Sequence, residues 1–225
     1  ESAYRQRHSC PCRVHTASPQ QPDEEAAAWE QFESVASVLR EFGALNGWES
    51  SEFGELVASL SGENELWLSV VLVNVAASRS PTSLSPAQLA AVLASTLDER
   101  VRPNSYVGFA PSEAVLDEIH ALATRAEALQ DSQARHGITF NVALDAGVCG
   151  LVEAWARGVE WADLIKETSL DAGDVYRLLR RSLELLKQVS MVPYVSAVAR
   201  RNARIALRAV DRYPIAEGAL MALPE

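Results

Sequence analysis

Apolar residues recur every three or four positions along most of this chain, which is the spacing of amphipathic helices. Between Gly43 and Ser51 the period breaks, and a turn with a short strand on each side is expected there. On this spacing, helices are predicted for residues 23–42, 51–60, 63–78, 86–99, 111–136, 142–157, 161–168, 172–186 and 194–210.

Residues that start and stop helices support these boundaries. Ser85 precedes Pro86, which places a capping hydroxyl before a proline at the first helical position. Gly137 and Gly158 stand where two helices should end, and Asp171 stands where another should begin. With almost no strand pattern, the chain is predicted to be all-α, an antiparallel bundle of about eight or nine helices joined by short loops.

The composition fits a chain with a large buried core. It has 225 residues, 48% of them hydrophobic, and its longest apolar run, residues 66–77, is interrupted by Ser69 and Asn74. That run is too short to cross a bilayer, so no membrane partner is expected. Three cysteines are too few for a disulfide framework and indicate a reducing, intracellular compartment.

Residues 1–22 lack periodicity and are predicted to be a flexible arm or linker. Cys10, Cys12 and His15 suggest a zinc cluster, but a closed zinc site needs a second pair of ligands, and none follows. The chain opens at Glu1 without an initiator methionine or a secretory signal, so a fragment of a longer protein is expected.

Charge is unevenly distributed along the chain. The net charge is -10, but residues 1–150 hold 9 Lys and Arg against 20 Asp and Glu, whereas residues 151–212 hold 11 against 8. Because a polyanion senses charge within roughly 8 to 10 Å, the local sign matters more than the average. The C-terminal third is therefore the candidate surface for nucleic acid.

Two predicted helices carry this basic charge. The first contains Arg177, Arg180 and Arg181. A second candidate basic face, on the last helix, consists of Arg200, Arg201, Arg204 and Arg208. Arginine can grip phosphate with two N–H groups and stack on a base, which suits single-stranded nucleic acid. The alternative is a solvated face paired with the acidic part of the chain.

Catalytic motifs are absent from the sequence. It contains no phosphate-binding loop of the form GxxxxGK[ST], no DExH box, no GxSxG and no HExxH. No metal site is predicted, and no acid, base and nucleophile can be assembled from the spacing of its four histidines. An unfamiliar small-molecule enzyme therefore ranks last among the functional hypotheses.

Several motifs in order resemble the C-terminal helical domain, or DSHCT domain, of superkiller/exosome-type DExH-box RNA helicases. The motifs are Trp155-Ala156-Arg157-Gly158, then Trp161, Gly173-Asp174 and Arg177-Leu178-Leu179-Arg180-Arg181. Upstream segments at residues 62–74, 85–95 and 103–115, and DRYPIAEGA from Asp211, are most similar to the plastid and cyanobacterial branch. The resemblance covers about residues 29–218.

The resemblance implies an organisation and a role. Residues 23–61 would be the end of a winged-helix region, residues 62–218 the DSHCT-like domain and residues 219–225 a tail. In this family the domain packs on the helicase motor and lines the exit path of single-stranded RNA. Arg177, Arg180 and Arg181 match the motif that touches the strand, with Arg177 the first candidate. A chloroplast location follows from the branch.

The sequence also departs from the family. The two motor domains are missing, so ATP and Mg²⁺ would bind elsewhere and no cofactor is expected in this chain. Tyr176 stands where the family more often has a small or apolar residue. The leading hypothesis is an accessory RNA-contacting domain acting with motor domains in cis or trans, within a larger ribonucleoprotein assembly. The alternative is a detached, protein-binding structural subunit of a plastid assembly.

Overall fold

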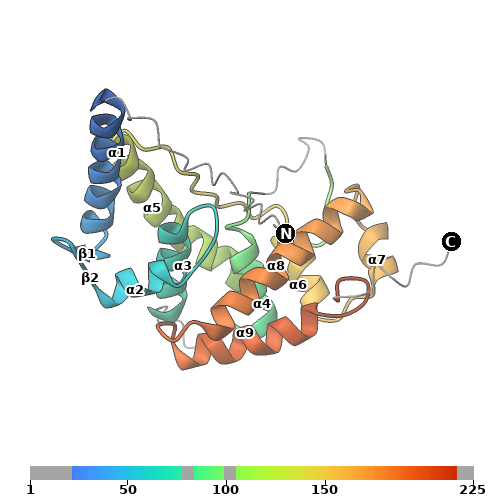
Figure 1. Ribbon diagram of the computed structural model, residues 1–225. Helices are drawn as coiled ribbons and strands as arrows, with labels where there is room; N and C mark the ends of the chain where they lie inside the picture. The colour runs from blue at the N-terminus through green and yellow to red at the C-terminus, as the bar shows by residue number, and fades with distance from the viewer. Residues whose placement is uncertain (1–21, 78–83, 99–104, 217–225) are drawn as a thin grey trace, which may run out of the picture. The chain divides into compact units, whose positions relative to one another are not determined.

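The computed structural model describes residues 22–77, 84–98 and 105–216 (Figure 1). The predictions for residues 1–21, including the cysteine and histidine cluster, and for the tail after residue 218 lie outside the described residues. The chain divides into two compact units at residue 33. The first helix runs across this division, and its first twelve residues belong to the N-terminal unit.

Helices make up most of the described part of the chain, which confirms the predicted all-α class. Besides the helices, the described residues form one two-stranded antiparallel hairpin, in which Leu45 pairs with Ser50 and Asn46 with Glu49. In chain order the elements are α1 (Pro22–Glu41), β1 (Leu45–Asn46), β2 (Glu49–Ser50), α2 (Glu52–Ala58), α3 (Glu65–Ala77), α4 (Pro86–Ala94), α5 (Glu113–Arg135), α6 (Cys149–Ala156), α7 (Trp161–Lys166), α8 (Ala172–Met191) and α9 (Ala197–Val210).

Within residues 34–225 the core forms around α4. Every residue of α4 from Leu89 to Ala94 is buried, and the helix packs against α5, α6, α8 and α9. Its start follows the sequence prediction, since the Ser85 hydroxyl accepts from the Gln88 backbone N–H and the Gln88 side chain accepts from the Ser85 backbone N–H. This capping box satisfies two N–H groups that the helix itself cannot.

The last two helices pack against each other in opposite directions (Figure 1). Leu178, Leu179 and Leu183 of α8 are buried, as the 3-and-4 spacing predicts. On α9 the buried side chains are small, because Ala199, Ala203 and Ala206 face inward. Small residues let two helix backbones approach closely, so α9 is held tightly on α8 and α4.

The predicted start of the helix at Val142 is wrong, since α6 begins only at Cys149. Residues before it are held by partners distant in sequence: Trp67 Nε1 donates to Ala143 O at 2.7 Å, and Asp145 N donates to Ser95 O at 2.9 Å. The Asp145 carboxylate also accepts from Gly147 N at 2.8 Å, which closes a local turn. These bonds satisfy the backbone without a helix.

Other boundaries also differ from prediction: α4 ends at Ala94 instead of residue 99, and α8 continues to Met191 instead of ending at residue 186. α9 begins at Ala197 instead of Tyr194, and Ser196 caps it by accepting from Ala199 N at 3.2 Å. α7 ends at Lys166 because Thr168 leaves the helix to form an isolated antiparallel bridge with Val107. No helix among the described residues is long and apolar enough to cross a membrane.

Candidate nucleic-acid interface

α8 presents one polar stripe along its length. Its residues are three or four apart, so they share one side of the helix: Asp174, Arg177, Arg181, Glu184 and Gln188. Asp171 is the N-cap, but its side chain makes no cap hydrogen bond. The Asp174 carboxylate, three residues further on, is engaged with Arg177.

Arg177 is the most exposed of the three predicted contact residues. Its side chain is 61% exposed, and its Nη2 lies 2.7 Å from Asp174 Oδ1. A solvent-exposed ion pair of this kind is worth only about 0.2 to 1 kcal/mol. This ion pair is weak enough for a phosphate to displace the Asp174 carboxylate from the guanidinium.

Arg180 and Arg181 bind other parts of the chain. Arg180, 27% exposed, donates from Nη1 to Ile215 O at 3.1 Å, and its Nη2 lies 3.5 Å from Glu184 Oε1. Arg181, 33% exposed, donates to Asp98 O at 3.3 Å and forms a 2.8 Å ion pair with Glu63. These contacts hold the loops before α3 and after α4, and the segment after α9, against α8. The three arginines thus do not form one uniform face.

A cavity of about 310 Å³ lies beside this stripe. Its wall includes Arg180 and Arg181 together with Gln188, Asn64 and Asn141. Several of these groups already form hydrogen bonds within the protein: Gln188 Oε1 accepts from Ser61 N at 2.9 Å, and Asn64 Nδ2 donates to Asn141 O at 3.0 Å. The cavity is therefore a mostly apolar recess with polar groups in its wall, next to the candidate strand contact.

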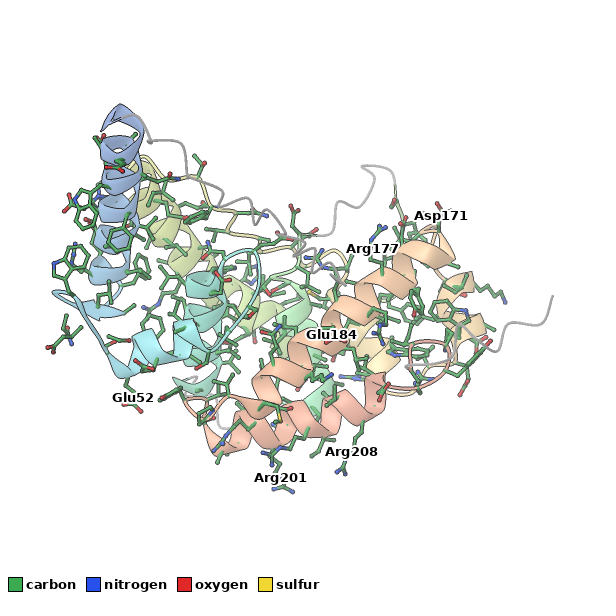
Figure 2. The ribbon with its side chains drawn as sticks, viewed as in Figure 1. Glu52, Asp171, Arg177, Glu184, Arg201 and Arg208 are labelled. Atoms are coloured by element: carbon green, nitrogen blue, oxygen red, sulfur yellow. The ribbon has the colours of Figure 1, made fainter. Side chains whose placement is uncertain are left out.

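The four arginines of α9 differ in exposure. Arg201, Arg204 and Arg208 are exposed, whereas Arg200 is partly buried. Figure 2 shows Arg201 and Arg208 projecting from the side of α9 that faces away from α8. The Nε of Arg200 is buried and has no hydrogen-bond partner among the described residues. The structure thus separates the candidate basic face of α9 from that of α8.

The Trp-Ala-Arg-Gly motif is built into the core. Trp155 is fully buried, and its Nε1 donates to Val210 O at 3.0 Å. Its ring meets that of Trp161 edge to face, with centroids 5.9 Å apart. Gly158 has φ +100°, a conformation that suits glycine, and it ends the helix as predicted.

Arg212 completes this cluster, and sequence reasoning missed it. Its guanidinium carbon lies 3.3 Å from the Trp155 ring centroid, and its Nη2 donates to Trp155 O at 2.9 Å and also to Val159 O. Removal from water lowers the pKa of Arg212. The one sequence feature that could have pointed to Arg212 is its place in the DRYP segment. The helical pattern alone could not show that Arg212 packs on Trp155.

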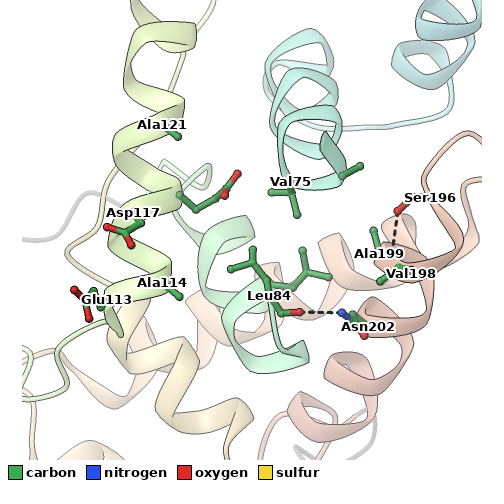
Figure 3. A pocket seen from close by; sticks show the side chains of 13 residues that line it. Val75, Leu84, Glu113, Ala114, Asp117, Ala121, Ser196, Val198, Ala199 and Asn202 are labelled. Carbon is green, nitrogen blue, oxygen red and sulfur yellow. Dashed lines mark hydrogen bonds between the residues drawn. The ribbon is translucent and has the colours of Figure 1, made fainter. Parts of the chain in front are cut away.

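A second cavity, of about 610 Å³, lies between α3, α4, α5 and α9 (Figure 3). Asp117 and the buried Glu118 line it, and Glu118 accepts from Asn74 Nδ2 at 2.8 Å. Across the cavity, Asn202 Nδ2 donates to Leu84 O at 2.9 Å. The described residues that line it include no histidine or cysteine.

The described residues also provide no metal site and no reactive thiol. No group of three or more His, Cys, Asp or Glu among them could hold a metal ion. Burial, with smaller contributions from Asp145 and Glu153, raises the pKa of Cys149 to about 12. A thiol with that pKa stays protonated at neutral pH and is a poor nucleophile.

Comparison with known proteins identifies the class. The chain belongs to the DSHCT (NUC185) domain family, whose model matches residues 49–217. It is similar to the DExH-box ATP-dependent RNA helicase DExH15 chloroplastic of Arabidopsis thaliana, with 38% identity over 200 residues. The match covers 86% of this chain but 17% of that helicase. These findings confirm the resemblance identified in the sequence and its association with DExH-box helicases.

Proposed function

We propose that this chain is the accessory C-terminal domain of an ATP-dependent RNA helicase and that it contacts single-stranded RNA through α8. Membership of the DSHCT family and similarity to a chloroplastic RNA helicase support the helicase context. The observation that carries the RNA contact is Arg177, which is exposed on the polar stripe of α8 and forms a surface ion pair with Asp174. The relative's name supports a chloroplast location.

Each arginine of α8 has its own role in this proposal. Arg177 exchanges Asp174 for an RNA phosphate, and Arg180 and Arg181 keep α8 in position through their contacts with Ile215, Glu63 and the Asp98 carbonyl. ATP and Mg²⁺ act on motor domains that the chain does not contain. This domain therefore guides the strand while the motor supplies the work.

The test is RNA binding by the whole chain and by two matched variants. We expect Arg177→Ala to weaken binding of a fluorescently labelled single-stranded RNA by about 5- to 10-fold, because one phosphate contact is lost. Arg125→Ala removes another exposed arginine, on α5, and should leave binding unchanged. Equal affinities for all three proteins by fluorescence anisotropy would contradict the α8 contact.

A second candidate function, a protein-binding structural subunit, rests on a different observation. A recess of about 420 Å³ has Phe42, Phe53, Val70, Val73 and Tyr194 in its wall, with Val73 and Tyr194 exposed. Glu52, Asn74 and Arg125 also line it. Exposed apolar patches of this kind mark protein contacts. This function is favoured if the chain purifies in a stable stoichiometric protein complex that is lost in Val73→Asp and contains no nucleic acid.

A further inference from the structure

α9 carries three exposed arginines and no acidic residue. Its sequence, AVARRNARIALRAV, contains neither Asp nor Glu. Within the described part of the chain, Arg201, Arg204 and Arg208 form no ion pair, whereas each arginine of the α8 motif has a carboxylate within reach. A solvated helix face usually alternates charges of both signs. The face of α9 is therefore complementary to an anionic partner.

The protein holds these three arginines in a fixed row. The inner face of α9 packs through alanines, and Asn202 donates a hydrogen bond to the Leu84 carbonyl. These contacts prevent α9 from rotating about its own axis. With a rise of about 1.5 Å per residue, the steps from Arg201 to Arg204 and from Arg204 to Arg208 are about 4.5 and 6 Å. Guanidinium groups on such a row can reach successive phosphates of one strand.

The chemistry of the rest of this face favours a nucleic-acid backbone over a protein. Its exposed apolar residues, Val198 and Ile205, are two turns apart and form no continuous apolar centre, which a stable protein interface needs. α9 contains no aromatic residue on which a base could stack. The contact available is therefore with phosphates alone.

We propose that the outer face of α9 is a second RNA-binding site, which holds the phosphate backbone without reading bases. The inference rests on the proposed RNA-guiding function and adds to it a site separate from α8, since Arg201 and Arg208 point away from that helix (Figure 2). The strand then passes over two faces of the domain: α8 contacts it through Arg177, and α9 retains it electrostatically.

Salt dependence measures the number of phosphate contacts directly. Single strands lose affinity with a slope of about 0.7 per phosphate contact on a log–log plot against salt. In the whole chain, replacing Arg201, Arg204 and Arg208 together with Gln should lower this slope for labelled oligouridylate by about 2. That corresponds to roughly a 20-fold smaller fall in affinity between about 50 and 200 mM salt. Thermal unfolding checks that the variant is folded.

Arg177→Ala, measured in parallel, separates the two proposals. A slope lower by about 2 in the triple variant, beside a decrease of about 0.7 in Arg177→Ala for its single phosphate contact, supports the α9 site. An unchanged slope in the triple variant, with weaker binding by Arg177→Ala, overturns the α9 site and leaves the proposed function standing. Absence of RNA binding by the wild type overturns both. If polyglutamate of matched charge binds α9 more tightly than RNA does, the site is for acidic protein and the inference is wrong.

Discussion

Gly150 lies where two backbone segments meet. A Cβ placed on it would lie 1.9 Å from the carbonyl oxygen of Phe109 and 2.7 Å from the Ala110 carbonyl carbon. Both neighbours are backbone atoms, so no side-chain rotation can relieve the overlap. This glycine therefore sets how closely the start of α6 approaches the segment before α5.

We predict that Gly150→Ala destabilises the fold by about 3 kcal/mol or more, because the backbone must move to admit one methyl group. Gly173→Ala is the control, since that glycine has open space around it and no positive φ. It should leave stability unchanged or raise it by up to about 1 kcal/mol, as alanine favours a helix. Urea unfolding of the two variants checks this contrast, and equal losses would contradict the packing argument.

Glu41, at the end of α1, binds three groups at the end of α5. Its carboxylate accepts from Ser132 at 2.6 Å, lies 2.6 Å from Arg135 and lies 2.8 Å from His136. Hydrogen bonds from Ser132, His136 and Arg135 lower the pKa of Glu41 from 4.5 to about 2. This lowered pKa links the stability of the α1–α5 contact to pH.

The pH dependence has a defined sign. A carboxyl group whose pKa is lower in the folded state stabilises the fold above its unfolded pKa, here 4.5, and loses that contribution as pH falls towards 2. We expect Glu41→Gln to be less stable than the wild type at pH 7 and the difference to narrow below pH 4.5. Denaturant midpoints at several pH values measure it. A difference that stays constant down to pH 3 would exclude Glu41 as the source.

The arginine row makes α9 less stable than its sequence could be. Like charges three or four residues apart on a helix cost about 0.2 to 0.5 kcal/mol per pair. We therefore predict that Arg204→Glu, which gains Arg200, Arg201 and Arg208 as neighbours of opposite charge, stabilises the fold by about 0.5 to 1 kcal/mol and weakens RNA binding. Calorimetry measures the stability of the variant, and fluorescence anisotropy on the same preparation measures its RNA binding. Lower stability in the variant would show that the row serves the fold.

Local pattern predicted the helices well where the helix itself supplies the signal. Ser85 with Pro86, Gly158, and the leucine stripe of α8 all act within a few residues, so their effects can be read in sequence. The segment before α6 could not be predicted, because its carbonyls are satisfied by Trp67 and other groups distant in sequence. Tertiary partners override an apolar helical pattern there.

The candidate site was predictable in composition but not in arrangement. The sequence indicated which arginines are clustered, yet not that Arg180 and Arg181 bind other loops while Arg201 and Arg208 face away from α8. Arg212 was missed because its partner is the face of Trp155 and not a charge at helical spacing. Long, flexible side chains choose partners that only the three-dimensional fold brings near.

For the whole molecule, the family assignment came from the order of several motifs, and the structure gives those motifs physical roles. Trp155 is buried in the core and Gly158 ends α6, whereas Arg177 is exposed. The match covers 17% of the helicase that the chain resembles. The proposal therefore concerns only what this domain contributes to a helicase. The exposed Arg177 on α8 and the arginine row on α9 are the features on which the proposed strand-guiding role depends.

Hydrogen exchange of the whole chain, with and without single-stranded RNA, tests this account most directly. Bound RNA slows amide exchange where it covers or stiffens the backbone. We expect protection within residues 172–191 and 197–210, which form α8 and α9, and no change in α2 or α5. Protection confined to α2, α3 and α5, or no protection anywhere with RNA in excess, would contradict it.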